Sequence, residues 1–175
     1  ISNNERSAFG HTRLSIVDLS EHGKQPMRSS CGRFTLTFNG EIYNHRELRV
    51  YMQKSFSFND WNGHSDTETL VNLFSFADLH EVLRLIKGMF AFAIYDNVTD
   101  SITLCRDRMG EKPLYFGKIA NEVLFASTPG AISKMSESKL CVNKTAIHGF
   151  LQKGYIGQEV TIFNGIKKVL PGNYV

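Results

Sequence analysis

The sequence predicts an α+β fold in which helices cover antiparallel sheets. Two observations support this prediction: strand-like segments follow one another as local hairpins, and helix-like segments occur in pairs between them. The apolar run 89–95 is followed across a short turn by residues 101–105, and residues 114–116 and 123–126 predict a second hairpin. We find no internal repeat or linker, which indicates one domain spanning all 175 residues.

The N-terminal part of the chain predicts two half-buried strands. Residues 12–17 and 33–38 alternate apolar and polar side chains, as a strand with one buried face does. The segment 20–33 between them is rich in Gly, Pro, Ser and Lys, which predicts a loop. Asn39 and Gly40 follow the second strand and predict a bend in the backbone.

Polar capping residues predict where five helices begin, and the first of these helices is expected to end at about residue 54. The expected N-caps are Asn44, Ser65, Asp78, Thr128 and Asn143. A glutamate follows each of the first three caps by three residues, which is the spacing of a capping box. Two further short strands are expected at residues 56–58 and 160–163.

Composition excludes several classes of function. The net charge of +3 is too small to indicate a nucleic-acid partner, and no apolar run approaches the ~20 residues of a membrane span. The six histidines have no metal-ligand spacing, so no metal site is expected. Cys31, Cys105 and Cys141 lie far apart and are odd in number, which favours a reducing compartment. With no signal-peptide pattern, this predicts a cytoplasmic protein.

A cluster of polar groups follows the strand predicted at residues 33–38. Asn39 offers a carboxamide, Gly40 an unhindered backbone N–H and Glu41 a carboxylate. Such groups between a strand and a helix can hold a small polar ligand. Taken alone, however, they are also the residues of an ordinary turn.

Six blocks in order give the chain a family resemblance. The first three read GHTRLSIVD (10–18), FNGEIYN (38–44) and SDTE (65–68). GMFAFAIYD (88–96), RDRMGEKPLY (106–115) and a C-terminal block of GYI, TIF and LPG follow. Together they resemble the class II glutamine amidotransferase domain at the front of asparagine synthetases. The resemblance implies the N-terminal nucleophile hydrolase fold, an αββα sandwich of two antiparallel sheets between helical layers. It also implies hydrolysis of the glutamine side-chain amide and delivery of ammonia to a second site.

The resemblance further implies which residues bind glutamine. Arg13 would grip the α-carboxylate through a two-pronged, charge-assisted contact, with the backbone near Val17 as a helper. Asp66 and Glu41 would bind the α-ammonium. Without the resemblance, Arg13 is an ordinary strand arginine and Asp66 an acid favoured by the helix dipole.

The oxyanion that forms when the amide is attacked needs hydrogen-bond donors. By resemblance these are the side chain of Asn39 and the backbone N–H of Gly40. The family's nucleophile is a cysteine at residue one of the mature chain, activated by its own α-amine. This chain starts at Ile1, and Cys31 lies downstream of Arg13, so Cys31 is rejected as the nucleophile.

We therefore expect a glutaminase domain over residues 1–175 that is truncated at its N-terminus and inactive as it stands. The alternative is a noncatalytic glutamine-binding or assembly domain that has lost its nucleophile. A missing N-terminal strand would leave a sheet edge uncovered, which predicts self-association into a homo-oligomer.

The expected partner is a synthetase domain or subunit that receives the ammonia. The ATP-dependent synthetase domain of the family carries a Ser-Gly-Gly-x-Asp-Ser loop, and this loop does not occur in the sequence. No cofactor is therefore expected in this domain, and ATP and magnesium belong to that absent domain. Aspartate is the default ammonia acceptor by resemblance.

Overall fold

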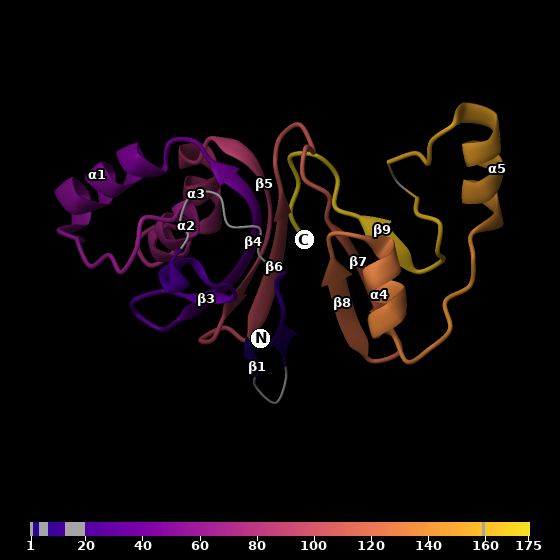
Figure 1. The fold of residues 1–175 in the computed structure, drawn as a ribbon, viewed down its shortest axis with the longest axis horizontal. Coiled ribbons are helices and arrows are strands. Elements are labelled where there is room, and N and C mark those ends of the chain that lie inside the picture. The colour runs from indigo at the N-terminus through magenta and orange to yellow at the C-terminus, as the bar shows by residue number, and fades with distance from the viewer. Residues whose placement is uncertain (1, 4–6, 13–19, 159) are drawn as a thin grey trace. The chain divides into compact units, whose positions relative to one another are not determined.

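The computed structural model describes residues 2–3, 7–12, 20–158 and 160–175 (Figure 1). The chain divides into two compact units, Ile1–Thr103 and Leu104–Val175. We describe each unit by itself. The predicted organisation of residues 1–175 as one domain stays a prediction.

A four-stranded sheet in the order β3-β4-β5-β6 organises the first unit. Its strands are β3 (Met27–Arg28), β4 (Phe34–Ile42), β5 (Gly88–Asp96) and β6 (Ser101–Arg106), which begins in this unit. The short strands β1 (Ser2–Asn3) and β2 (Ala8–Phe9) form a separate antiparallel pair. The hairpin predicted between residues 89–95 and 101–105 corresponds to β5 and β6, so it is confirmed.

The antiparallel pair β4–β5 is the centre of this sheet. All nine residues of β4 have a partner, from Phe34 opposite Asp96 to Ile42 opposite Gly88. At the Phe34–Asp96 end of this pair, the Arg33 guanidinium donates to both carboxylate oxygens of Asp96 at 2.8 and 2.6 Å. Burial and a continuous ladder thus fix the register along the whole strand.

Two glycines allow β4 and β5 to approach closely at the other end. A Cβ on Gly40 would lie 2.1 Å from the carbonyl oxygen of Met89, and one on Gly88 would lie 2.0 Å from that of Glu41. Both glycines also have positive φ, 151° and 155°. Only glycine fits both the space and the backbone conformation at these two positions.

Three helices of the first unit lie on one side of the β4–β5 pair (Figure 1). They are α1 (His45–Phe56), α2 (Asp66–Leu73) and α3 (Leu79–Leu85), and a 3-10 turn occupies Glu21–Gly23. Every residue of α2 is buried. Phe74, directly after α2, packs its ring 5.9 Å from the rings of both Phe34 and Phe92. These aromatic contacts join α2 to one face of the sheet.

Ser65 and Asp78 cap α2 and α3 through their side chains, as predicted. The structure corrects three other predictions in this unit. Asn39 and Gly40 form no bend, because β4 continues through them to Ile42. Asn44 precedes α1, but its side chain makes no capping hydrogen bond. Residues 56–58 form no strand: α1 runs through the first of them and ends in a left-handed cap.

A three-stranded antiparallel sheet in the order β8-β7-β9 organises the second unit. The predicted hairpin is confirmed as β7 (Tyr115–Ile119) and β8 (Glu122–Ala126). Thr128 and Asn143 cap α4 (Pro129–Met135) and α5 (Lys144–Lys153) through their side chains, as predicted. The strand predicted at 160–163 is wrong, because the third strand is β9 (Ile166–Lys168).

The charged connection after β6 is held by two side chains. The Arg106 guanidinium donates to the carbonyl oxygens of Gly110, Lys112 and Val169 at 2.7–2.8 Å. The buried Asp107 carboxylate accepts from three backbone N–H groups within the next five residues, those of Met109, Glu111 and Lys112. These charges therefore order a loop of the second unit.

The predicted α+β class with antiparallel sheets and helices is confirmed. Among the helices of the described residues, none is both long enough and apolar enough to cross a membrane.

We expect Gly88→Ala to destabilise the protein by about 1–3 kcal/mol, because a Cβ there collides with the backbone of β4 and requires a strained φ. Urea unfolding followed by circular dichroism measures this loss. The matched control is Gly149→Ala inside α5, where a Cβ meets nothing within 4 Å and alanine favours the helix. An unchanged unfolding midpoint for Gly88→Ala would contradict the tight approach of β4 and β5.

Candidate functional site

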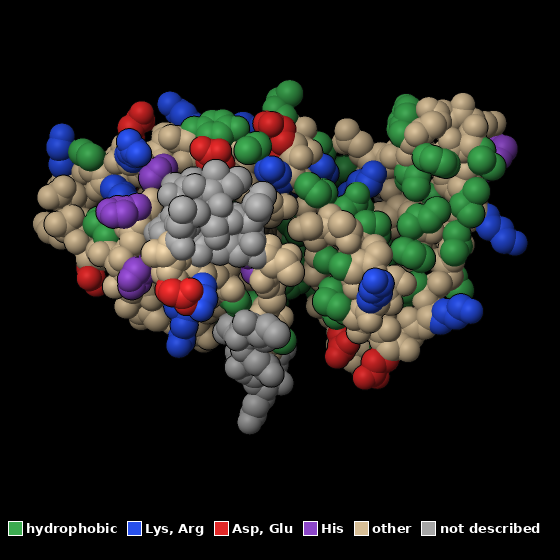
Figure 2. Space-filling view, viewed as in Figure 1, with side chains coloured by type: hydrophobic (Ala, Val, Ile, Leu, Met, Phe, Trp, Pro, Cys, Tyr) green, Lys and Arg blue, Asp and Glu red, His purple; other side chains and the backbone are tan. Residues whose placement is uncertain are grey.

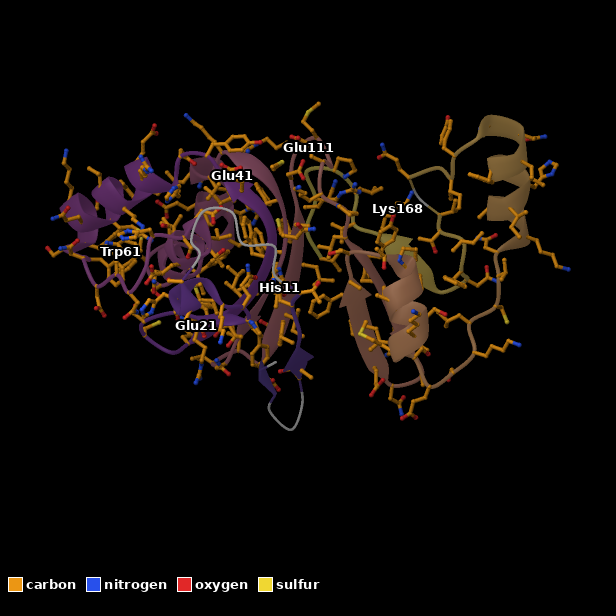
Figure 3. The ribbon with its side chains drawn as sticks, viewed as in Figure 1. His11, Glu21, Glu41, Trp61, Glu111 and Lys168 are labelled. Carbon is orange, nitrogen blue, oxygen red and sulfur yellow. The ribbon has the colours of Figure 1, made fainter. Side chains whose placement is uncertain are left out.

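The end of β4 presents the residues that the sequence analysis singled out. Successive side chains of a strand point to opposite faces, so Asn39 and Glu41 share one face of β4. Both are partly exposed, and neither side chain has a hydrogen-bond partner among the described residues. Figure 3 shows Glu41 at this end of the strand. A carboxamide and a carboxylate are thus available on one face.

Asp66 lies against the same end of β4. It is the first residue of α2, it is 5% exposed, and Ser65 caps the helix by accepting from the N–H of Glu68. The Oδ2 atom of Asp66 accepts from the backbone N–H of Ile42 at 2.8 Å, and Oδ1 accepts from that of Thr67 at 2.8 Å. The structure therefore brings Asp66 next to Glu41 in β4, although 25 positions separate them in the sequence. Each carboxylate oxygen keeps a further lone pair for a ligand.

Arg49 fixes the segment that carries Asp66. Its guanidinium donates to Thr69 Oγ1 at 2.8 Å, to the carbonyl oxygens of Gly63 and Ser65 at 2.9 and 3.0 Å, and to Glu68 Oε2 at 3.1 Å. The Trp61 ring packs beneath the guanidinium, with 4.0 Å between the Arg49 carbon and the ring centroid. A planar, multidentate cation suits this role better than lysine would.

The Glu68 carboxylate completes this arrangement from within α2. It accepts from the backbone N–H groups of Asn62 and Gly63 at 2.7 and 3.0 Å, in addition to its ion pair with Arg49. Glu68 was predicted to complete a capping box with Ser65, and half of the box is present: Ser65 binds the Glu68 N–H, whereas the Glu68 carboxylate holds the preceding loop. Sequence reasoning did not identify Arg49 as part of the site. Its position four residues after His45 in α1 does not indicate which distant residues it contacts.

Asn44 joins the ends of the two central strands. Its Nδ2 donates to the carbonyl oxygen of Leu85 and its Oδ1 accepts from the backbone N–H of Lys87, both at 2.9 Å. The N–H of Tyr43 donates to the carbonyl oxygen of Lys87 at 2.8 Å. The carboxamide therefore aligns the start of β5 with the end of β4. This use of its polar atoms explains why Asn44 does not cap α1.

The described cysteines offer no activated thiol next to this site. Burial raises the pKa of Cys105 to about 12. Cys31 is exposed and lies on the turn before β4, where its Sγ is 3.2 Å from Ser29 Oγ and 3.1 Å from Ser75 Oγ. Burial raises the pKa of Cys31, but the hydrogen bonds with Ser29, Ser75 and the backbone together outweigh it, and the net shift is downward. Cys141 is exposed in the second unit.

Two predicted glutamine ligands, Arg13 and Val17, lie outside the described residues. In the described part of the chain, no group of three or more His, Cys, Asp or Glu side chains is arranged to hold a metal ion.

The whole chain, residues 1–175, matches the family described as "Glutamine amidotransferase domain". It is 34% identical over 170 residues to "Asparagine synthetase [glutamine-hydrolyzing] 1" of Bacillus subtilis (strain 168), a match that covers 97% of this chain and 26% of the relative. It is 31% identical over 175 residues to "Amidase chry2" of Gibberella zeae, covering 99% of this chain and 25% of that protein. The chain thus spans about a quarter of the length of these curated relatives.

Solved structures show the same fold. A glutamine phosphoribosylpyrophosphate amidotransferase from B. subtilis superposes with a TM-score of 0.57 at 24% identity, covering 70% of this chain and 28% of that one. An allosteric regulatory enzyme of purine biosynthesis gives a TM-score of 0.54 at 23% identity, with 69% of this chain and 28% of that one covered. The predicted fold class, that of the N-terminal nucleophile amidotransferases, agrees with these neighbours. From the match over its entire length, the chain belongs to the glutamine amidotransferase domain family.

Proposed function

We propose that this domain binds free glutamine, hydrolyses its side-chain amide and supplies the ammonia to an asparagine-synthetase-like partner. Membership of the glutamine amidotransferase family and the names of the relatives support this proposal. The structural observation that carries it is the hydrogen bond from the Ile42 N–H to Asp66, which joins the buried acid to the strand end that holds Asn39, Gly40 and Glu41.

In this proposal Asp66 and Glu41 bind the α-ammonium of glutamine. Asp66 is buried and already accepts two backbone hydrogen bonds, so it is held in place before the substrate arrives. A cation between two carboxylates also offsets their mutual repulsion. Arg13, helped by the backbone near Val17, is proposed to bind the α-carboxylate.

Asn39 and Gly40 are proposed to stabilise the oxyanion. The Asn39 side chain has no competing hydrogen bond among the described residues, so its N–H₂ can face a developing charge. Gly40 has no Cβ, so substrate can approach its backbone N–H closely. Both donors belong to a strand paired along its full length, and a rigid strand loses little energy to reorganisation during the reaction.

The attacking thiol is proposed to be an N-terminal cysteine, as the family resemblance implies, and not one of the three described cysteines. Cys105 is too buried and too weakly acidic, and the hydrogen-bond partners of Cys31 are Ser29 and Ser75 rather than a catalytic base. By this proposal glutamine binding depends on the residues named above, and ammonia release depends on the N-terminal thiol. The alternative, a noncatalytic glutamine-binding domain, shares the binding residues and differs only in the chemistry.

The remaining parts of the proposal concern the partner. An asparagine-synthetase-like partner would use aspartate as the acceptor, together with ATP and magnesium, in a domain of its own. The glutaminase residues need no cofactor, because the thiol chemistry proceeds through donors and acceptors of the protein. We propose a cytoplasmic location for this reaction.

We expect Asp66→Asn to weaken glutamine binding by about tenfold or more, because it removes a negative charge from the proposed ammonium site. Isothermal titration calorimetry with glutamine measures the change. The matched control is Asp78→Asn, the same substitution at the N-terminus of α3, where asparagine caps equally well. Equal affinities for the Asp66 and Asp78 variants would refute the ammonium role.

Arg13→Ala is expected to abolish measurable glutamine binding in the same titration, since the α-carboxylate would lose its charge-assisted bidentate partner. Arg84→Ala, an exposed arginine of α3, removes the same charge outside the proposed site. If glutamine bound the Arg13 variant with unchanged affinity, both the glutaminase and the noncatalytic binding domain would be excluded.

The third prediction for this site tests the chemistry. We expect the chain extended by an N-terminal Cys-Gly segment to release ammonia from glutamine, and Asn39→Ala in that extended chain to lower kcat by about 10²–10³-fold. A coupled ammonia assay gives kcat and KM separately. Asn121→Ala, in the exposed β7–β8 turn, is the control. Glutamine binding without ammonia release from the extended chain would favour the noncatalytic alternative.

A further inference from the structure

Four basic side chains of the first unit line a cavity that the proposed glutamine chemistry does not use. Its volume is about 260 Å³, and the lining residues are His45, Arg46, Arg49 and His64. The first three belong to the beginning of α1, and the fourth lies two residues before α2. Figure 2 shows histidine, lysine and arginine side chains gathered on the face of the molecule where α1 and α2 lie.

One polar atom of His45, a residue that lines this cavity, lacks a hydrogen-bond partner among the described residues. The Nδ1 atom of His45 is fully buried and makes no hydrogen bond with the described residues. Buried polar atoms are bonded in the great majority of cases, so such an atom calls for an explanation. His45 is the first residue of α1, where the backbone N–H groups of the first turn also have no partner within the helix. A ligand that accepts hydrogen bonds would satisfy these N–H groups of the first turn.

Among the charges around the cavity, that of Arg46 favours an anion. The positive charge of Arg49 is neutralised by Glu68, whose Oε2 lies 3.1 Å away. Arg49 therefore lines the cavity but contributes little net charge to it. Arg46 is exposed and has no ion pair with the described residues, so its charge remains uncompensated. The groups that face His45 are Arg46 and Arg49 from α1, Asp66 from α2 and Glu41 from β4. Burial holds the pKa of His45 below its ordinary value; Asp66 opposes this shift, and Arg49 and Arg46 add to it.

We propose that this cavity binds a small tetrahedral oxyanion of the phosphate and sulfate class, held by Arg46, His45 and His64 at the N-terminus of α1. Arginine and protonated histidine donate charge-assisted hydrogen bonds to such oxygens, and the helix N-terminus adds a favourable dipole. The cavity is smaller than the roughly 300–1,000 Å³ pockets that take drug-sized ligands. It therefore suits a free oxyanion or a small phosphate monoester, and not a nucleotide.

Sulfate is the probe of choice, because it remains a dianion while the His45 ring titrates. We expect the chain to bind sulfate saturably at about pH 5 and about tenfold more weakly at about pH 8, since His45, whose pKa is lowered, carries a charge only at the acidic end of this range. NMR of the His45 ring should show its pKa rising as sulfate is added, because the anion stabilises the imidazolium. Calorimetry gives the affinity at each pH. Inorganic phosphate and methyl phosphate then compare a free oxyanion with a monoester.

Arg46→Ala is expected to weaken sulfate binding by about tenfold or more, while Arg84→Ala changes it by less than about twofold. Arg46 is exposed, so its removal leaves the core intact. Equal losses in the two variants, or no saturation in the wild-type chain, would overturn the proposal. Acetate binding as tightly as sulfate would overturn the assignment to tetrahedral oxyanions.

The same variants separate this proposal from the glutaminase proposal. Arg46→Ala should leave glutamine affinity unchanged, and Asp66→Asn should leave sulfate bound at about pH 8, where His45 is neutral in both proteins. Sulfate binding without glutamine binding would support the oxyanion site and refute the glutamine site, and the reverse result would do the opposite.

Discussion

The close approach of β4 and β5 is the constraint on which the first unit depends. The two strands pair along nine residues, and at the far end their backbones come so near that neither Gly40 nor Gly88 can carry a side chain. This contact fixes the positions and orientations of Asn39 and Glu41. A residue within a paired strand cannot rotate independently of the hydrogen bonds that join the two strands. Catalytic donors need such rigidity, since electrostatic stabilisation is effective only when the donors are oriented in advance.

A second set of contacts turns the strand end into a candidate site. Asp66 accepts from the Ile42 N–H, and Arg49 holds the loop and helix turn that carry Asp66. The ion pair of Arg49 with Glu68 is largely buried, and its remaining donors are taken by the neighbouring carbonyl and hydroxyl oxygens, as a buried charge requires. The acid that we assign to substrate binding is therefore supported by residues that do not themselves touch the proposed ligand.

Sequence reasoning identified most elements of the fold but misassigned several polar residues. The hairpins and the caps at Ser65, Thr128 and Asn143 are present because they depend on neighbours within a few positions. Asn44 differs, since it binds the backbone of residues more than 40 positions away. Asn39 and Gly40 have turn propensity, yet pairing with β5 keeps them in a strand. Tertiary contacts override local propensity wherever a long-range partner competes for the same atoms.

Local sequence patterns were enough to predict the α+β class and the capping of most helices. Six ordered blocks also supplied the resemblance that named Asn39, Gly40, Glu41 and Asp66. These features can be predicted because they depend on the local pattern of polar and apolar residues and on residue identity. The contact of Asp66 with the end of β4, the anchoring of its helix by Arg49 and the cavity lined by four basic side chains could be found only in the folded chain. Each of these depends on which distant segments pack together, because a hydrogen bond or a cavity wall is set by distance in space and not by spacing along the chain.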